Sequence, residues 1–499
     1  MVDVPPAPPP PPGAWSALPG PWPPPPPGIA PARPRPRWLM ALALATVAVL
    51  LVGLVVAVVR LGDDGYPDEW DPRVADLATF VEHERGLQFD HPVYVDFLSA
   101  SEYTEVATTS EDDLTDADRD ELDRYAGTLR ALGVASGPLD LFTAYNQVSD
   151  GGTLAFYDPA DRRVRVRGTE MSVGLRVTLV HELTHALQDQ RFDLDRLYEE
   201  DVDSSQAVAF RGLVEGDALR VEDAYVAAEL SPAEQDDYDA EFAEQVEQGE
   251  AAIEDVPPFV SAGFGVPYLL GQPLAEMLAN EGGNAAVDDA LRDPPSTEEH
   301  LFDPASFLAG EEAEEVDLGL DDDVEVLDDG PFGSPSWYLV LAERIDPLTA
   351  FDAALGWGGD AYASFERDGT SCIRAAFAGD EAADEEAMTA ALDEWAGTLP
   401  DGMVEVLDLD GHPGFESCDP GEDVDIEVAG RSEEALYVPS LWGFLVADAA
   451  TVADAGTARC YAGAVLAGLT YDEIVDPTGV AFGTDEFQQT MSDAYTSCT

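Results

Sequence analysis

A short segment with helical periodicity, Val177–Gln190, constrains this chain more than any other feature of its sequence. It carries His181, Glu182 and His185. Residues four apart project from the same face of an α-helix, so the two imidazoles can converge on one ion. In this spacing neutral imidazoles hold Zn²⁺, the ion makes a water acidic, and Glu182 takes a proton from that water as it attacks a carbonyl. The segment therefore predicts a zinc site with a general base.

The same pattern has a second interpretation. Apolar residues recur through the segment, so the helix is expected to be buried, and buried histidines need polar partners. Two hydrogen-bonded core histidines without a metal would satisfy this requirement. A zinc site differs from that alternative because it needs a third protein ligand.

The best candidate for the third ligand is Glu215, on the next segment with helical spacing. Apolar residues recur around it at Phe210, Leu213, Val214 and Ala218. A carboxylate beside a buried stripe is costly unless it is paired or coordinated. Gly212 and Gly216, within a turn on either side, would let this helix approach the histidine helix closely.

Other assignments of the third ligand stay open at this point. The alternative ligands are Asp189, Asp217 and Glu222. Glu215 could also form a salt bridge with an arginine and bind no metal.

Five stretches of the chain together resemble a known group of proteins. They are His181–Gln190, Leu213–Ala218, Val266–Gly271, Pro294–Glu298 and Gly356–Tyr362. Their order is similar to that in a group of predicted bacterial metallopeptidases of the gluzincin type, over about residues 88–365. The resemblance implies that His181, His185 and Glu215 are the zinc ligands and that Glu182 is the base.

The resemblance has one departure. Members of the group tend to read Ser-Thr-Glu-Gln-x-Leu-His-Pro after the paired prolines, whereas this chain reads Ser296-Thr-Glu-Glu-His300-Leu-Phe-Asp-Pro. The histidine is displaced, so the resemblance assigns no role to His300.

Composition excludes some partners. The formal net charge is -77, and the chain contains no lysine. Such a surface repels nucleic acid and acidic lipid headgroups, so neither is expected as a partner. The acidity fits either an adaptation to high salt or a plain compositional bias. With 499 residues, 45% of them hydrophobic, the chain is long enough for two or three domains.

The N-terminal part predicts a membrane anchor. Residues 1–37 are rich in proline and are expected to form a disordered tail, a spacer in preference to a docking segment. Residues 38–60 contain an apolar run about 33 Å long as a helix, which is enough to span a bilayer. The run is longer than a signal-peptide core. Arginines precede it and acidic residues follow, so we expect a single-pass protein with a cytoplasmic N-terminus and the remainder outside.

Beyond a juxtamembrane segment at 61–86, which includes a short helix near Val74–Glu84, we expect a zinc metallopeptidase domain over residues 87–310. Its expected elements are a strand in 88–98, a helix at 112–132, a hairpin of 153–157 and 163–167, the two ligand helices, an acidic helix at 233–254 and an apolar helix at 266–279. The expected fold class is α+β, with a zincin-like domain built from the histidine helix and a small sheet.

Two features of this domain have alternative interpretations. Tyr268 lies on the apolar helix and is a candidate catalytic group, because a phenol near zinc can hydrogen-bond the tetrahedral intermediate; the alternative is an ordinary core tyrosine. Arg163, Arg165 and Arg167 face one side of their strand. They could attract acidic substrates, but neutralising carboxylates of the same chain is the favoured role.

Residues 311–335 are acidic and end in glycines and prolines, which predicts a linker or solvated loop without the calcium-ligand spacing of a helix–loop–helix. Residues 336–499 are expected to be an α+β unit followed by helices. The four cysteines fall in this region. An even number outside the cytoplasm favours two disulfides, and proximity along the chain favours Cys372–Cys418 and Cys460–Cys498.

The sequence thus predicts a membrane-anchored, extracytoplasmic zinc peptidase. The main alternative is a catalytically silent scaffold or binding ectodomain that retains a zinc site. A structural zinc is normally closed by four protein ligands, whereas this site offers three, and no ligand role requires Glu182. A third possibility is hydrolysis of another amide, such as a cell-wall peptide.

Overall fold

The computed structural model describes residues 65–151, 153–198, 204–321, 324–476, 482 and 484–498. The proline-rich tail and the expected membrane span at 38–60 lie outside the described residues. Within the described ranges, no helix is both long and apolar enough to cross a membrane.

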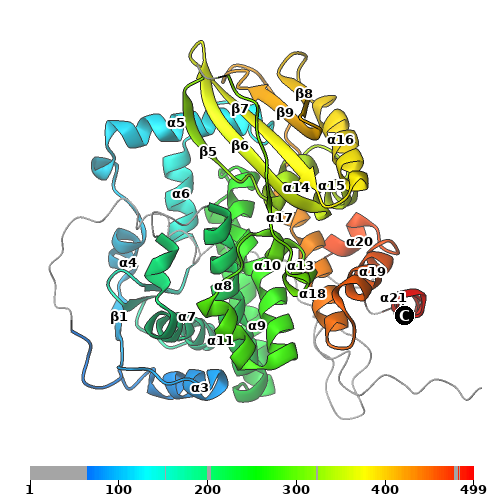
Figure 1. Cartoon of the computed structure of the whole chain (residues 1–499). Coiled ribbons are helices and arrows are strands. Elements are labelled where there is room, and N and C mark those ends of the chain that lie inside the picture. Colours follow the sequence, from blue (N-terminus) through cyan, green and yellow to red (C-terminus); the bar gives the residue numbers. More distant parts are fainter. Residues whose placement is uncertain are drawn as a thin grey trace, which may run out of the picture.

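The described part is an α+β structure, as expected, with many helices and two separate sheets (Figure 1). The α-helices up to residue 310 are α3 (Ala75–Arg85), α4 (Ala100–Ala107), α5 (Asp116–Ala131), α6 (Leu141–Asp150), α7 (Val173–Phe192), α8 (Ser204–Glu229), α9 (Pro232–Ala252), α10 (Pro258–Gly282), α11 (Asn284–Arg292), α12 (Glu299–Phe302) and α13 (Pro304–Ala309). The later helices are α14 (Ser334–Ala342), α15 (Pro347–Leu355), α16 (Ala382–Ala396), α17 (Ser432–Ala435), α18 (Tyr437–Ala450), α19 (Ala455–Leu466), α20 (Tyr471–Val475) and α21 (Asp485–Cys498).

The smaller sheet contains the expected hairpin. Its strands are β1 (Tyr94–Leu98), β2 (Ala155–Asp158) and β3 (Arg163–Arg167), in the order β1-β3-β2. β3 pairs parallel to β1 and antiparallel to β2. The first strand begins only at Tyr94, later than expected, which fits the presence of Pro92, a residue without a backbone N–H.

The three arginines of β3 pair with carboxylates of the same chain. The Arg163 guanidinium lies 3.1 Å from Asp96, and the Arg167 guanidinium lies 2.6 Å from Asp150. Arg165 bonds to Asp158 and Asp161. The favoured role of these arginines, neutralising local acidity, is therefore confirmed.

Helices α8 and α10 cross at glycines. A Cβ built on Gly271 of α10 would overlap the carbonyl oxygen of Gly212, and one on Gly216 would overlap that of Gly271. The expectation that Gly212 and Gly216 serve the approach of α8 to the histidine helix is therefore wrong: they allow α8 to contact α10, and Gly212 also contacts Leu301 of α12. Helix α10 continues through Pro267 and Pro273, although proline disfavours a helix interior. It is therefore longer than the helix expected at 266–279.

The larger sheet lies at the top of the molecule in Figure 1. Its strands are β4 (Glu314–Glu315), β5 (Val326–Gly330), β6 (Trp357–Arg367), β7 (Thr370–Gly379), β8 (Val404–Leu409) and β9 (His412–Cys418), in the order β4-β6-β7-β9-β8, with β5 also on β6. The acidic segment 311–335 is thus more than a loop. Its two short strands, β4 and β5, pair with β6.

The conformation of the Gly356–Tyr362 stretch is set by one buried carboxylate. Asp360 accepts hydrogen bonds from the indole N–H groups of Trp337 and Trp357, at 2.8 and 2.9 Å. It also accepts from the backbone N–H groups of Phe332 and Gly333, at 3.0 and 2.7 Å. This stretch therefore has a structural role, joining β6 to α14 and the end of the acidic segment.

Both expected disulfides are present. Cys372 and Cys418 lie opposite each other on β7 and β9, and Cys460 of α19 is bonded to Cys498 of α21. The second bond ties the last helix to α19. The helices α17 to α21 confirm the expectation that helices follow the α+β unit.

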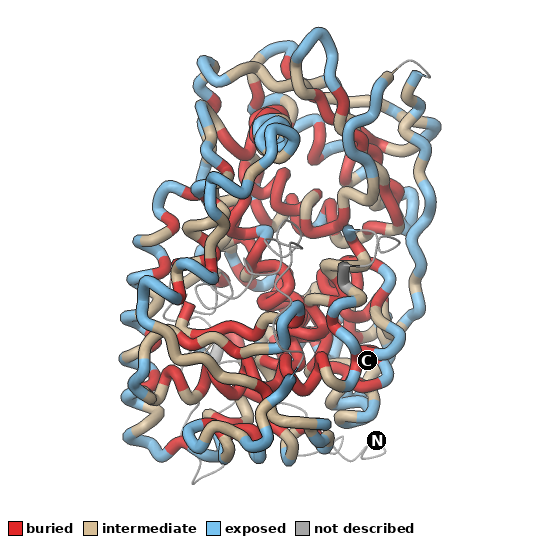
Figure 2. Tube along the Cα trace, turned by 90° about the vertical axis from the view of Figure 1, so that its left-hand side faces the viewer, coloured by how far each residue is buried: buried red, intermediate tan, exposed pale blue. Residues whose placement is uncertain are grey.

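The largest hydrophobic core extends from Ala126 to Ala494 and includes α8, α10, α14 and α18. A second core joins α3, β2, β3 and α7. Figure 2 shows these buried segments in the interior and the exposed segments at the outside. The C-terminal region consequently shares the larger core with α8 and packs mainly against α10.

Candidate metal centre

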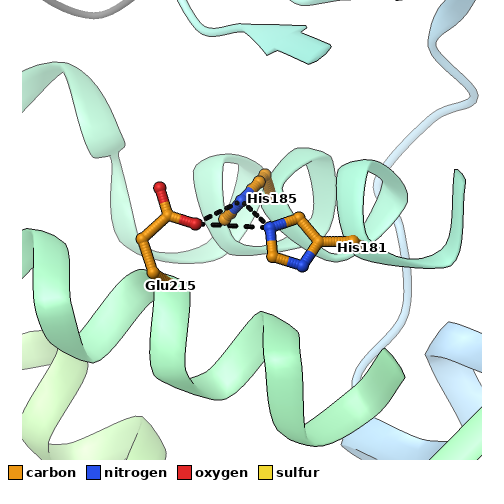
Figure 3. A group of neighbouring side chains, drawn as sticks. All are labelled: His181, His185 and Glu215. Atoms are coloured by element: carbon orange, nitrogen blue, oxygen red, sulfur yellow. Dashed lines mark hydrogen bonds and ion pairs between the residues drawn. The ribbon is translucent and has the colours of Figure 1, made fainter. Parts of the chain in front are cut away.

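Three side chains from α7 and α8 converge in the interior (Figure 3). The Nε2 atoms of His181 and His185 are 2.9 Å apart. Oε2 of Glu215 lies 3.3 Å from the first and 3.2 Å from the second. The histidines lie one turn apart on α7, and α8 supplies the carboxylate, so the sequence prediction of these three as neighbours is correct.

This triangle fits a small cation. A tetrahedral zinc ion with bonds of about 2.0–2.1 Å keeps its ligand atoms about 3.3 Å apart. Two unprotonated imidazole nitrogens and a carboxylate oxygen this close repel one another unless a cation or a proton lies between them. All three residues are buried. The donor set and its spacing are therefore compatible with a zinc ion held by three protein ligands.

Gln188 determines which nitrogen of His185 faces the triangle. Its Nε2 donates to the Val214 carbonyl oxygen at 3.0 Å and to Asp217 at 2.9 Å, so its Oε1 must be the atom that faces His185. That oxygen lies 2.9 Å from Nδ1 of His185 and can only accept. Nδ1 therefore carries the proton, and Nε2 is left with its lone pair toward a metal.

A second carboxylate lies behind His181. Nδ1 of His181 lies 3.2 Å from Oε2 of Glu222, within ion-pair distance but without the geometry of a hydrogen bond. Glu222 also accepts a hydrogen bond from the Tyr238 hydroxyl at 3.2 Å. Burial lowers the pKa of His181, but the adjacent Glu215 and Glu222 outweigh it and raise this pKa to about 10. The pocket thus favours a positive charge.

The two aspartates weighed as alternative ligands have structural partners. Asp217 pairs with Arg85 at 2.8 Å, and Arg85 also pairs with Asp288 at 2.7 Å. Asp189 accepts from the Tyr157 hydroxyl at 2.6 Å and from the backbone N–H of Leu194 at 3.0 Å. Neither belongs to the triangle, in which Glu215 takes the third position.

Glu182 is held by the edge of the small sheet. Its Oε2 accepts a hydrogen bond from the backbone N–H of Tyr157 on β2 at 2.7 Å. Its Oε1 is buried and has no hydrogen-bond partner among the described residues. Burial raises the pKa of Glu182 to about 7, against the lowering effect of His181 and His185. Oε2 is therefore fixed by a hydrogen bond, and Oε1 is available to accept a proton.

Burial disfavours the charge of Glu215, but the two histidines outweigh it and hold the pKa of this carboxyl well below its ordinary value. Glu215 therefore stays ionised, as a metal ligand must. The guanidinium of Arg211, one turn earlier on α8, lies 3.9 Å from Oε1 of Glu215, the oxygen outside the triangle.

Two further residues singled out in the sequence lie in buried positions. Tyr268 is 3% exposed, in the part of α10 that packs along α8, and its role as a stabilising group stays a prediction. His300 lies in α12, with Nδ1 2.7 Å from the Ser306 hydroxyl, and burial lowers its pKa to about 4. It is not one of the three residues of the triangle.

Sequence reasoning missed two contributors to the centre. Gln188 follows His185 by three residues on α7, a spacing that would have indicated a contact. Tyr157 contributes through its backbone N–H, for which residue type gives no signal. No family model, curated protein or solved structure matches this chain.

Proposed function

We propose that this chain is a zinc-dependent peptidase with a zincin-like catalytic region, in which His181, His185 and Glu215 hold the metal and Glu182 is the general base. The observation that carries the proposal is the combination of a three-ligand centre with a buried glutamate that is not itself a ligand. A purely structural zinc site would have no use for Glu182.

The chain's own residues support general acid–base work. When bound, Zn²⁺ supplies a Lewis acid that polarises a carbonyl group and makes water more acidic. The Tyr157 N–H fixes one oxygen of Glu182, so the other oxygen accepts the proton as water adds to the carbonyl and then donates it to the leaving amine. A pKa raised to about 7 by burial suits a group that must both accept and release a proton near neutral pH.

We also propose that the enzyme acts outside the cytoplasm on a peptide or protein, anchored through residues 38–60. The anchor rests on the sequence alone. The two disulfides support the location, because such bonds form and persist in oxidising compartments.

The test separates the base from the ligands. In the full chain, Glu182→Gln should keep about one zinc per chain, measured by plasma mass spectrometry, while hydrolysis of a peptide library falls by about 10²–10⁴-fold. Glu215→Ala removes a ligand, so zinc content and hydrolysis should fall together.

Two results would replace this proposal with the scaffold alternative. One is unchanged hydrolysis in Glu182→Gln. The other is a fully zinc-loaded wild-type protein that cleaves no member of a broad library, including cell-wall peptides.

A further inference from the structure

A second group of carboxylates lies apart from the zinc ligands. Glu299 of α12, Glu311 at the start of the acidic segment and Asp380 directly after β7 each place one oxygen within 4.8 Å of the others. Glu299 and Glu311 lie in neighbouring stretches of the chain, and Asp380 comes much later in the sequence. Carboxylates packed this closely repel one another unless something positive lies between them.

The positive charge of Arg459 is too small to neutralise all the carboxylates around it. Arg459 of α19 donates to both oxygens of Glu311, at 2.8 and 2.6 Å, and to Asp303 at 2.5 Å. Asp303 also accepts from the Trp442 indole at 3.1 Å, so its charge is satisfied. Arg459 thus pairs with Asp303 and Glu311, and among the described residues it forms no ion pair within 4.0 Å with Glu299 or Asp380.

The buried carboxyl group of Glu299 indicates that this group of carboxylates requires a positively charged partner. It is 2% exposed, and its Oε1 is buried with no hydrogen-bond partner within the ranges that the structure describes. Burial, with Glu311 and Asp380 adding to it, raises the pKa of Glu299 to about 9. Asp380 lies at an exposed position, so the group has a buried end and an open end through which an ion and its waters can enter.

We propose that Glu299, Glu311 and Asp380 form a binding site for a hard divalent cation, Ca²⁺, separate from the zinc centre. The donors are all carboxylate oxygens, which Ca²⁺ prefers. With bonds of 2.3–2.6 Å, Ca²⁺ accommodates oxygens up to about 5 Å apart on opposite sides, which covers the spacing here. Mg²⁺ dehydrates reluctantly and is usually held by one or two carboxylates with several waters, so three protein carboxylates favour Ca²⁺.

The proposed calcium site would connect α12, which packs on α8, to the larger sheet. Glu299 lies on α12, and Leu301 of the same short helix packs against Gly212 of α8, three residues before the zinc ligand Glu215. Asp380 directly follows β7 of the larger sheet. A bound Ca²⁺ would therefore hold α12 between the sheet and the ligand helix.

The experiment uses the full chain, depleted of metal and then reloaded with zinc. CaCl₂ is added at constant ionic strength, with thermal unfolding and equilibrium dialysis as readouts. We expect about one tight Ca²⁺ per chain and a rise in Tm of about 3 °C at saturation. Glu299→Gln and Asp380→Asn should each weaken this binding at least tenfold, whereas Glu312→Gln, an exposed neighbour of Glu311, should leave it unchanged.

Loss of folding does not obscure the result. Glu299→Gln replaces a buried carboxyl group by a neutral amide of the same shape, so without calcium its Tm should equal or exceed that of the wild type, and Asp380→Asn alters an exposed side chain. Three outcomes would overturn the proposal: no calcium response in the wild type, which would leave the group to protons; an unchanged response in both variants, which would indicate diffuse binding to the acidic surface; and an equal response to Mg²⁺.

Discussion

At the residue scale, the amide of Gln188 is the contact that selects the tautomer of His185 in which Nε2 keeps its lone pair toward His181 and Glu215. Gln188→Ala removes the acceptor for Nδ1–H, so the ring can rotate or change tautomer. We expect zinc to bind about 10–100-fold more weakly, measured by competition with a chromogenic chelator. Gln190→Ala is the matched control on the same helix, since Gln190 bonds to Asp90 and His91 instead. Equal affinities in the two variants would contradict the role of Gln188.

Asp448, on α18 and away from the candidate metal centre, is expected to make the stability of the protein depend on pH. Its Oδ1 is buried without a hydrogen-bond partner in the described part of the chain, and burial raises its pKa to about 7. The folded state therefore keeps a proton that the unfolded chain releases near pH 4, so the contribution of Asp448 to stability falls as pH rises from about 4 to 7 and is constant above. Asp448→Asn should raise the free energy of unfolding by about 2–4 kcal/mol at pH 8 and by little at pH 4.

Urea unfolding at the two pH values measures the difference for Asp448→Asn. The N-cap variant Asp454→Asn is a suitable control, because Asp454 accepts from the Thr457 N–H at the exposed start of α19. A gain in Asp448→Asn that is the same at both pH values would show that burial of the charge is not its cause.

At the element scale, the crossing of α8 and α10 depends on backbone contact between glycines. Gly271→Ala would drive a methyl group into the Gly212 carbonyl, which cannot move aside as a side chain can. We expect a loss of about 3 kcal/mol in the free energy of unfolding. Gly263→Ala, in the same helix with open space at its Cβ, should instead gain about 0.5–1 kcal/mol. Chemical denaturation of both variants gives the comparison, and a similar effect at the two positions would refute close packing as the reason.

At the scale of the whole molecule, the formal net charge of -77 should control how stability depends on salt. Self-repulsion of this surface destabilises the folded state and is screened by salt, since the Debye length falls to about 3 Å at 1 M. Raising NaCl from about 0.05 to about 1 M should stabilise the protein by about 2 kcal/mol, a rise in Tm of roughly 2 °C for a chain of this length. Scanning calorimetry tests this, with KCl as the control for an effect specific to sodium. A Tm that is flat or falls with salt would contradict it.

Features that depend on residues close together in the chain could be predicted from the amino-acid order alone. Four-residue spacing on a helix places His181 beside His185 whatever surrounds them, and the Asp158–Asp161 turn sets the β2–β3 hairpin. Amphipathic spacing also placed Glu215 next to a buried stripe, where a carboxylate requires a partner. These inferences succeeded because helix periodicity and turn geometry act over a few residues.

Contacts between groups far apart in the chain could not be predicted from the sequence. Gly212 is small because α10 and α12 approach it, not α7, and the Tyr157 N–H reaches Glu182 because β2 lies against α7. The group of Glu299, Glu311 and Asp380 exists only once α12 packs beside the larger sheet. Such contacts depend on how whole elements pack, and that packing is set by the summed burial of many side chains, which no local pattern in the sequence records.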